Sequence, residues 1–157
     1  MQAWMLKAFS LAPHVVERML RVFPLDRLVD RIERDRYTAR EVIAHLADYE
    51  QFVLEAFRMA KLRPGGTIEN YDPDQRSKDH HFAEKDVYRE AEVFESRRLM
   101  TVEFLQSYTE EDWTKTVTTP SGRSITAHEF FTAILAHDME HVDQLSAYLA
   151  TEVATIS

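Results

Sequence analysis

Residues 38–62 read TAREVIAHLADYEQFVLEAFRMAKL, and this stretch decides the fold. Thr38 followed three residues later by Glu41 is typical of a capping box, in which two side chains close the start of a helix. Behind this cap, mainly apolar residues recur at steps of three and four: Val42, Leu46, Tyr49, Val53, Phe57 and Ala60. This spacing places them on one face of an α-helix, so the stretch predicts a long helix with one side in the core.

Three further stretches have helical patterns, at about residues 3–23, 85–107 and 126–150. The chain contains only three glycines and five prolines, too few for the many tight turns of a fold built from short strands. The sequence therefore predicts an all-α protein, a four-helix bundle formed as a single domain over residues 1–157.

The segments between these helices have weaker patterns. Pro13 predicts a kink or a new start within the first helix. Residues 25–36 are charged and predict a short helical turn, whereas 63–76, RPGGTIENYDPDQR, are expected to form a mobile loop. Residues 116–126, TVTTPSGRSIT, predict a small extended turn before the last helix.

The charge and composition argue against several classes of function. The formal net charge is −8 and there is no block of lysine or arginine, which makes nucleic acid or an anionic membrane a poor electrostatic partner. The absence of cysteine excludes disulfides, cysteine metal sites and a thiol nucleophile of the protein's own. No secretory signal or long apolar run is evident, so we expect a cytoplasmic protein without a membrane segment.

Three histidines occupy helix positions that should face the core. His137 and His141 lie four residues apart on the apolar stripe of the last helix, and His45 lies on the stripe of residues 38–62. Imidazoles at i and i+4 can converge on one ion, and a facing helix can add the third ligand. Three protein ligands would leave a position open for substrate or water, and Zn²⁺ or Ni²⁺ would suit the set. The alternative is that they are core histidines, hydrogen-bonded to carbonyls or carboxylates.

Acidic residues beside these histidines are candidates for orienting them. Asp48 lies one turn after His45 and Asp138 directly follows His137, and a metal-bound imidazole commonly donates its second N–H to such a carboxylate. Glu50 and Asp143 are expected on the solvent-exposed edges of their helices. The remaining histidines have weaker positions and are not predicted to join the site: His14, His80, His81 and His128.

Several of these stretches resemble the DinB-like superfamily. TAREVIAHLADYE (38–50) is similar to its second helix, and PSGRSITAHEFFTAILAHDMEHVDQL (120–145) is similar to its last turn and helix. FESRRLMTVEFLQSYTEEDWTKTV (94–117) resembles the third helix and the turn after it. The resemblance implies an up-down-down-up bundle, often dimeric, with a metal triad at His45, His137 and His141.

What the resemblance implies about activity is broader. Relatives include S-transferases that use bacillithiol, mycothiol or glutathione, maleylpyruvate isomerases, and others labelled metal-dependent hydrolases. We expect a homodimeric metal-dependent enzyme acting on a small molecule, foremost a thiol-dependent S-transferase whose low-molecular-weight thiol comes from outside the chain. The first alternative is a hydrolase of esters or amides, with Asp138 of HDMEH in the place of a general base. The second is a non-catalytic metal-binding stress-response protein. No catalytic base could be named from the sequence.

Overall fold

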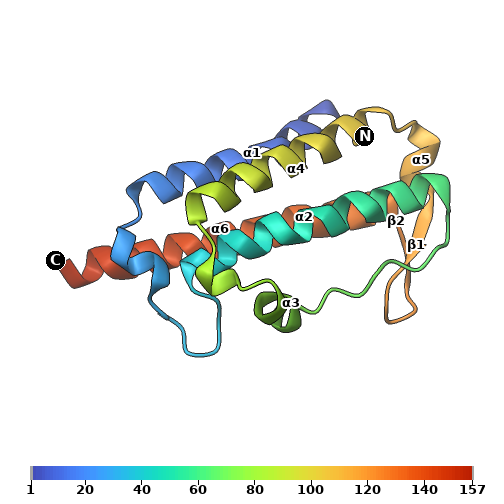
Figure 1. The fold of residues 1–157 in the computed structure, drawn as a ribbon. Helices are drawn as coiled ribbons and strands as arrows, with labels where there is room; N and C mark the ends of the chain where they lie inside the picture. Colours follow the sequence, from blue (N-terminus) through green and yellow to red (C-terminus); the bar gives the residue numbers. More distant parts are fainter. Residues whose placement is uncertain (1, 157) are drawn as a thin grey trace.

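A computed structural model of the chain describes residues 2–156, which form four long helices packed lengthwise (Figure 1). These are α1 (Ala3–Val22), α2 (Ala39–Leu62), α4 (Val87–Gln106) and α6 (Ala127–Ile156). In Figure 1, α1 and α6 run in one direction and α2 and α4 in the other, which confirms the up-down-down-up four-helix bundle. Both α1 and α2 pack on α4 and on α6, so the helices surround one core.

Short elements connect the long helices. Between α1 and α2 lies η1 (Leu25–Val29), and between α2 and α4 lie α3 (Pro73–Asp79) and η2 (Phe82–Glu84). Between α4 and α6 lie α5 (Glu110–Thr114), β1 (Thr116–Thr118) and β2 (Ser124–Thr126). The two strands pair antiparallel with Val117 opposite Ile125, so the predicted extended turn is a β-hairpin. Gly122 lies in its turn with φ +90°, a conformation that strains other residues.

The helix starts are fixed by the residues that the sequence indicates. Thr38 Oγ1 accepts from the backbone N–H of Glu41 at 3.2 Å, and the Glu41 carboxylate accepts from the backbone N–H of Thr38 at 3.1 Å. Thr126 and Glu129 form the same reciprocal pair ahead of α6, at 2.8 and 3.0 Å. Of the two expectations for Pro13, a new helix start at this residue is wrong, because α1 is a single helix through it.

The segment expected to be a mobile loop, residues 63–76, is instead tied to the hairpin. The Gly65 N–H donates to the Thr116 carbonyl at 2.8 Å, and the Ile68 N–H donates to the Thr118 carbonyl at 2.9 Å. Further along, the Tyr37 hydroxyl donates to the Pro73 carbonyl where α3 begins. The segment therefore lies along the bundle in a fixed course, which the polar sequence alone did not indicate.

The core consists of two apolar clusters separated by a polar layer. On α2 the first cluster ends at Ala47 and the second begins at Val53. We use the term polar layer for the residues that lie between them: Glu50, Arg98, Thr101, Asp138, His137 and His141. This layer places ionisable groups near the middle of the bundle, where a buried charge destabilises the fold unless it is paired and hydrogen-bonded.

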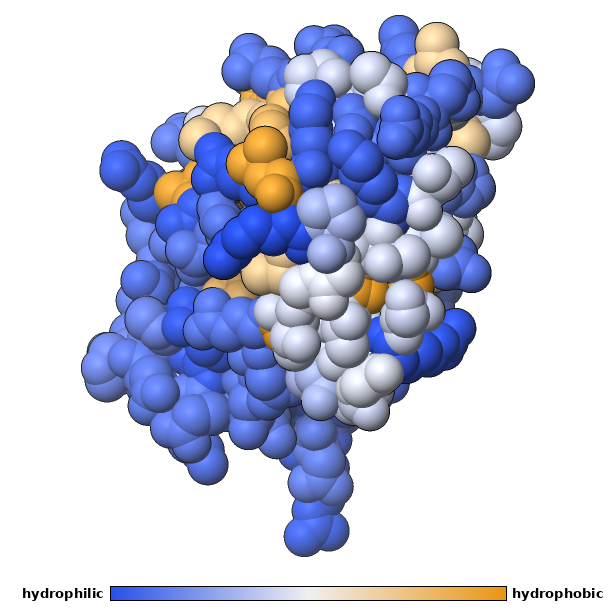
Figure 2. All heavy atoms as spheres, turned by 90° about the vertical axis from the view of Figure 1, so that its right-hand side faces the viewer, coloured by the Kyte–Doolittle hydropathy of each residue, from blue (hydrophilic) through white to orange (hydrophobic). Residues whose placement is uncertain are grey.

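The outer surface is mainly polar at the end that carries the hairpin (Figure 2). The end of the bundle that carries the hairpin is covered mainly by hydrophilic and neutral residues, with apolar side chains in small separate spots (Figure 2). Within residues 2–156, no helix is both long enough and apolar enough to cross a membrane.

Candidate metal centre

The three predicted histidines meet in the bundle. His45 Nε2 lies 3.1 Å from His137 Nε2, and His141 Nε2 lies 3.1 Å from the same atom. His45 is buried, with 5% of its surface exposed, and the other two rings are partly buried. His137 and His141 lie one helical turn apart on α6. Helix α2 packs against α6 and adds His45 as the third ring.

Hydrogen bonds on the outer side determine the tautomer of His141. The Gln144 side-chain N–H donates to the Tyr148 hydroxyl at 2.8 Å, which leaves Gln144 Oε1 facing His141 Nδ1 at 3.0 Å. An amide oxygen only accepts, so Nδ1 carries the proton and Nε2 presents its lone pair to the centre. Tyr148 in turn donates to the Tyr37 carbonyl at 3.1 Å, which holds this chain of donors in one direction.

A second chain orients His45. The Tyr71 hydroxyl donates to Asp48 Oδ2 at 2.9 Å, so its oxygen is free to accept from His45 Nδ1 at 3.1 Å. Arg76 donates twice to the Asp48 carboxylate, at 2.9 and 2.7 Å. The arginine and Tyr71 together hold the pKa of Asp48 below its usual value against the opposing effect of burial. His45 Nε2 therefore also presents a lone pair to the centre.

Burial keeps the cluster neutral. Burial, and next the neighbouring His141 and His137, lower the pKa of His45 to about 2. Burial, together with His141 and Arg98, lowers the pKa of His137 to about 3, and burial lowers that of His141 too. Neutral imidazole is the form that binds a metal, so the surroundings favour the ligand form.

The arrangement fits a divalent ion better than a network of histidines alone. Two nitrogens bound tetrahedrally at about 2.05 Å from an ion lie about 3.3 Å apart, close to the observed separation. Without an ion, at most one proton, on His137 Nε2, lies among the three inward nitrogens, and it can satisfy only one neighbour well. His137 Nδ1 is buried and has no hydrogen-bond partner in the described part of the chain, with or without an ion, so only the inward Nε2 atoms distinguish the two arrangements. An ion would accept all three inward lone pairs.

The two predicted aspartates have different partners from those expected. Asp48 reaches His45 through Tyr71 and does not bond it directly. Both oxygens of Asp138 accept from Arg98, at 2.8 and 3.0 Å, and His137 Nδ1 bonds no described residue, so Asp138 does not orient His137. The reason is that a buried guanidinium competes for the carboxylate and forms a bidentate pair with it.

Glu50 corrects another prediction, because it lies in the core and not on the exposed edge of α2. It is 2% exposed and accepts from Arg98 at 2.8 and 2.9 Å. Arg98 also donates to the Phe9 carbonyl at 2.7 Å and lies over the Phe9 ring, 3.9 Å from its centroid. Asp143 is exposed, as expected. We call Glu50, Arg98 and Asp138 the buried triad.

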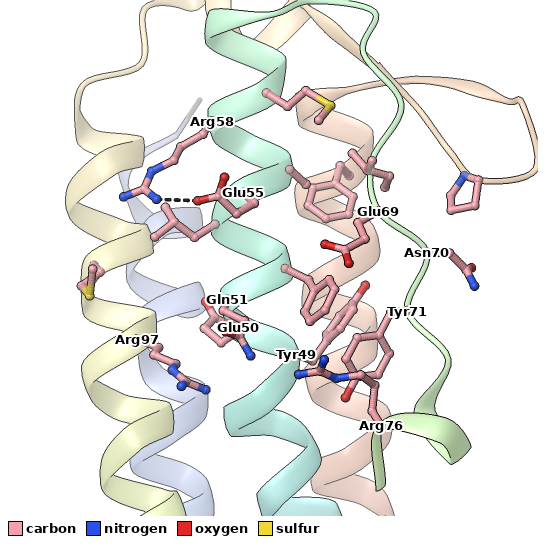
Figure 3. A pocket seen from close by; sticks show the side chains of 18 of the residues that line it. Tyr49, Glu50, Gln51, Glu55, Arg58, Glu69, Asn70, Tyr71, Arg76 and Arg97 are labelled. Carbon is pink, nitrogen blue, oxygen red and sulfur yellow. Dashed lines mark hydrogen bonds and ion pairs between the residues drawn. The ribbon is translucent and has the colours of Figure 1, made fainter. Parts of the chain in front are cut away.

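Two hollows adjoin the histidines. A pocket of about 430 Å³ opens onto them, lined by Tyr37, Tyr49 and Tyr71. A larger groove of about 870 Å³ runs along α2 and shares Tyr49 and Tyr71 with this pocket (Figure 3). The larger hollow is thus not itself at the three histidines, and the two tyrosine rings, 4.8 Å apart, form the boundary. These volumes suit small molecules.

The other histidines stay apart from the centre. His80, His81 and His128 are exposed. His14 forms a second group with Glu17 and Glu95, but its Nδ1 lies 4.0 Å from Glu95 and the side chains of His14 and Glu95 are about half exposed. We therefore assign the candidate centre to the group on α2 and α6 alone.

Comparison with protein families identifies the family of this chain. A family model of the DinB superfamily matches residues 8–145. The chain belongs to the DinB superfamily. No curated protein matches its sequence significantly.

Solved structures agree on the fold of this DinB-superfamily chain. It is similar to YfiT from Bacillus subtilis, described as a probable metal-dependent hydrolase with an unusual four-helix bundle topology; 17% of residues are identical, 93% of this chain and 86% of YfiT are covered, and the TM-score is 0.81. It is similar to a mycothiol-dependent maleylpyruvate isomerase at 17% identity and TM-score 0.73, covering 90% of this chain and 59% of that one. A DinB-like protein from Bacillus cereus shares 18% identity at TM-score 0.66, over 94% and 90% of the two chains.

Sequence reasoning missed three residues around the centre of this DinB-superfamily protein. Arg98 occurs on the apolar stripe of α4, and a charge in that position was a signal that it needed a buried partner. Gln144 follows His141 by three residues, a spacing that lets the two side chains meet on a helix. Tyr71 lies in a polar loop, and no local pattern indicated that it reaches the histidines.

Proposed function

We propose that this chain is a metal-dependent enzyme that acts on a small molecule, with transfer of a low-molecular-weight thiol as the foremost reaction. The observation that carries the proposal is the convergence of three neutral imidazole nitrogens, two of them with tautomers set by hydrogen bonds on the outer side. His45, His137 and His141 would hold the ion, and three protein ligands leave a position for a reactant.

A divalent ion in this position would favour the thiolate form of a bound thiol, or the hydroxide form of a bound water. The chain itself supplies an aromatic lining. Tyr37, Tyr49 and Tyr71 line the pocket that opens onto the histidines. The Tyr49 hydroxyl has no hydrogen-bond partner among the described residues, and Figure 3 shows this side chain among the residues that line the groove. It is therefore available to a ligand. Burial raises its pKa, which keeps it a donor.

The buried triad favours thiol transfer over hydrolysis. In HDMEH the residue in the place of a general base is Asp138, and both of its oxygens are engaged by Arg98. An ion would lower the pKa of a bound water as well as that of a bound thiol, but a thiol, with a free pKa of about 8.5, ionises far more readily than water, so thiol transfer depends less on a separate base. Hydrolysis of small esters or amides remains the second candidate, because the fold is similar to that of YfiT.

The first experiment is metal analysis of protein purified without an affinity tag, beside a His137→Ala variant. We expect close to one equivalent of a late first-row metal in the wild type and loss of most of it in the variant. Gln75→Ala is a suitable surface control, because this exposed side chain bonds only Asp79 on its own helix. Equal metal contents in wild type and His137→Ala would refute the centre.

The second experiment separates the reactions. The wild type is given a halogenated nitroarene with bacillithiol, mycothiol or glutathione, and separately a panel of esters and amides without thiol. Chelator-sensitive turnover only in the presence of a thiol would support S-transfer, and turnover without thiol would support the hydrolase. Bound metal with turnover in neither panel would count against an enzyme and favour a metal-binding role.

A further inference from the structure

Among the described residues, Tyr71 is the only hydrogen-bond partner of His45 that lies outside the four long helices. We propose that Tyr71 is a positioning residue for the metal centre, which fixes the tautomer of His45 and joins the connection between α2 and α3 to the occupancy of the site. The inference rests on the proposed metal site but assigns a role to a residue outside the ligand set.

The first step is the direction of the hydrogen bonds. The Tyr71 hydroxyl has one proton, and the ionised Asp48 carboxylate can only accept, so the 2.9 Å bond to Asp48 uses that proton. The 3.1 Å contact to His45 must then run from His45 Nδ1–H to the tyrosine oxygen. The proton is thus held on the outer nitrogen of His45, and Nε2 is left to bind.

The second step is what holds Tyr71. Arg76, at the other side of Asp48, donates to both carboxylate oxygens and keeps the acceptor charged. The Arg76 guanidinium also lies over the Phe52 ring, 5.1 Å from its centroid, and the Tyr71 ring packs edge-on against Phe52 at 4.9 Å. Figure 3 shows Tyr71 and Arg76 close together at the end of the groove. The hydroxyl therefore has little freedom to turn away from His45.

The third step concerns the backbone that carries Tyr71. The same segment is hydrogen-bonded to β1 through Gly65 and Ile68, and to Tyr37 through the Pro73 carbonyl. Tyr71 lies between these attachments and is the side chain that connects the segment to the ligands. A bound ion that tightens His45 should therefore also reduce opening of residues 66–72, because the two are linked by one chain of hydrogen bonds.

The test uses full-length Tyr71→Phe, which keeps the packed ring and removes only the hydroxyl. We expect Zn²⁺ affinity, measured by competition with a chromophoric chelator, to fall about 10- to 100-fold, as for other residues that orient a ligand. Amide hydrogen exchange of residues 66–72 should slow on adding Zn²⁺ to the wild type and change much less in the variant.

Tyr49→Phe is the matched control. Tyr49 stacks on His45 with a ring-centroid distance of 5.7 Å, yet its hydroxyl bonds no described residue and would serve a reactant and not the ion. The Zn²⁺ affinity of this variant, which is the only quantity compared, should therefore stay within about twofold of the wild type. Equal losses in both variants would show that ring packing, and not the Tyr71 hydroxyl, determines affinity, and would overturn the proposal.

A measurement without metal keeps the proposal separate from the proposed function. In the apo protein, ¹⁵N chemical shifts of the imidazole should report the Nδ1–H tautomer of His45 in the wild type and an increased share of the Nε2–H tautomer in Tyr71→Phe. If the wild type failed to bind Zn²⁺ but showed this change, only the metal function would be wrong. The role of Tyr71 would be refuted if Tyr71→Phe left the tautomer of His45 unchanged. It would also be refuted if the wild type bound Zn²⁺ and Tyr71→Phe bound it with the same affinity.

Discussion

At the scale of single residues, Arg98 has the most demanding surroundings in the core. It is 2% exposed and carries one positive charge against two carboxylates, Glu50 and Asp138. Burial, and to a smaller extent the neighbouring Asp138, raise the pKa of Glu50, and Arg98 opposes this by charge and by hydrogen bonds. Removing only the arginine would leave two buried carboxylates without their donor. The stability lost in this way is much larger than the net stability that an intact buried ion pair contributes.

We therefore expect Arg98→Met to lower the free energy of unfolding by about 3–5 kcal/mol at pH 7, measured by urea denaturation. The neighbouring Arg97 is partly exposed and donates to the Ala47 carbonyl, so Arg97→Met should cost less than about 1 kcal/mol. If both variants lost similar free energy, the triad would not be the source of the effect. Replacing Glu50 and Asp138 by leucine together with Arg98→Met should recover most of the loss.

At the scale of elements, α2 begins where its sequence indicates because the determinants are local. Thr38 and Glu41 are three residues apart and bond each other directly, although the Glu41 carboxylate also accepts from Arg31 at 3.0 Å. Thr126 and Glu129 likewise bond each other directly before α6. The course of residues 63–76 could not be predicted in this way, since its hydrogen-bond partners in β1 lie about fifty residues further along.

The cap of α2 gives a prediction at this scale. Thr38→Ala should lower the free energy of unfolding by about 1 kcal/mol, because the N–H of Glu41 loses its acceptor at a buried position. Thr38→Ser keeps the hydroxyl and should restore most of it. The comparison is made by denaturant unfolding with circular dichroism. A serine variant as unstable as the alanine variant would show that the methyl group of threonine matters and the cap does not.

At the scale of the whole molecule, the histidines connect stability to pH. In the unfolded chain a histidine has a pKa of about 6.5, whereas in the folded protein burial lowers the pKa of His45 to about 2 and of His137 to about 3. Below about pH 6.5 the unfolded chain therefore binds more protons than the folded protein does, and these groups destabilise the fold progressively as the pH falls. Above that pH both states are neutral and the histidines make no pH-dependent contribution.

We expect the metal-free protein to melt at a lower temperature at pH 5 than at pH 7.5, and His141→Ala to show a smaller difference. Saturating Zn²⁺ should raise the melting temperature of the wild type at pH 7.5, and this increase should be small at pH 5, where protons compete for the imidazoles. The melting temperatures of the wild type and of His141→Ala are measured by thermal unfolding at pH 5 and at pH 7.5, each with and without Zn²⁺. Equal stabilisation of wild type and His141→Ala by Zn²⁺ would contradict it.

The triad of histidines was predictable because periodicity places each on a core-facing stripe, and the fold brings the stripes together. The outer partners were not, because they depend on how side chains compete across helices. Asp138 is adjacent to His137 in sequence but turns to Arg98 of α4, and Asp48 is separated from His45 by a tyrosine that arrives from a loop. Adjacency in sequence indicates which groups are near, and only the packed bundle determines which pairs form.

Arg98 also has a consequence for which bundle forms. From α4 it reaches the Phe9 carbonyl of α1, Glu50 of α2 and Asp138 of α6, so all four helices meet at one side chain. Apolar clusters tolerate several arrangements of similar helices, but a reversed α4 or an exchange of neighbours would bury one guanidinium and two carboxylates apart from one another. We therefore expect the apolar residues to determine how stable the bundle is, and this one arginine to discriminate between the up-down-down-up course and its competitors.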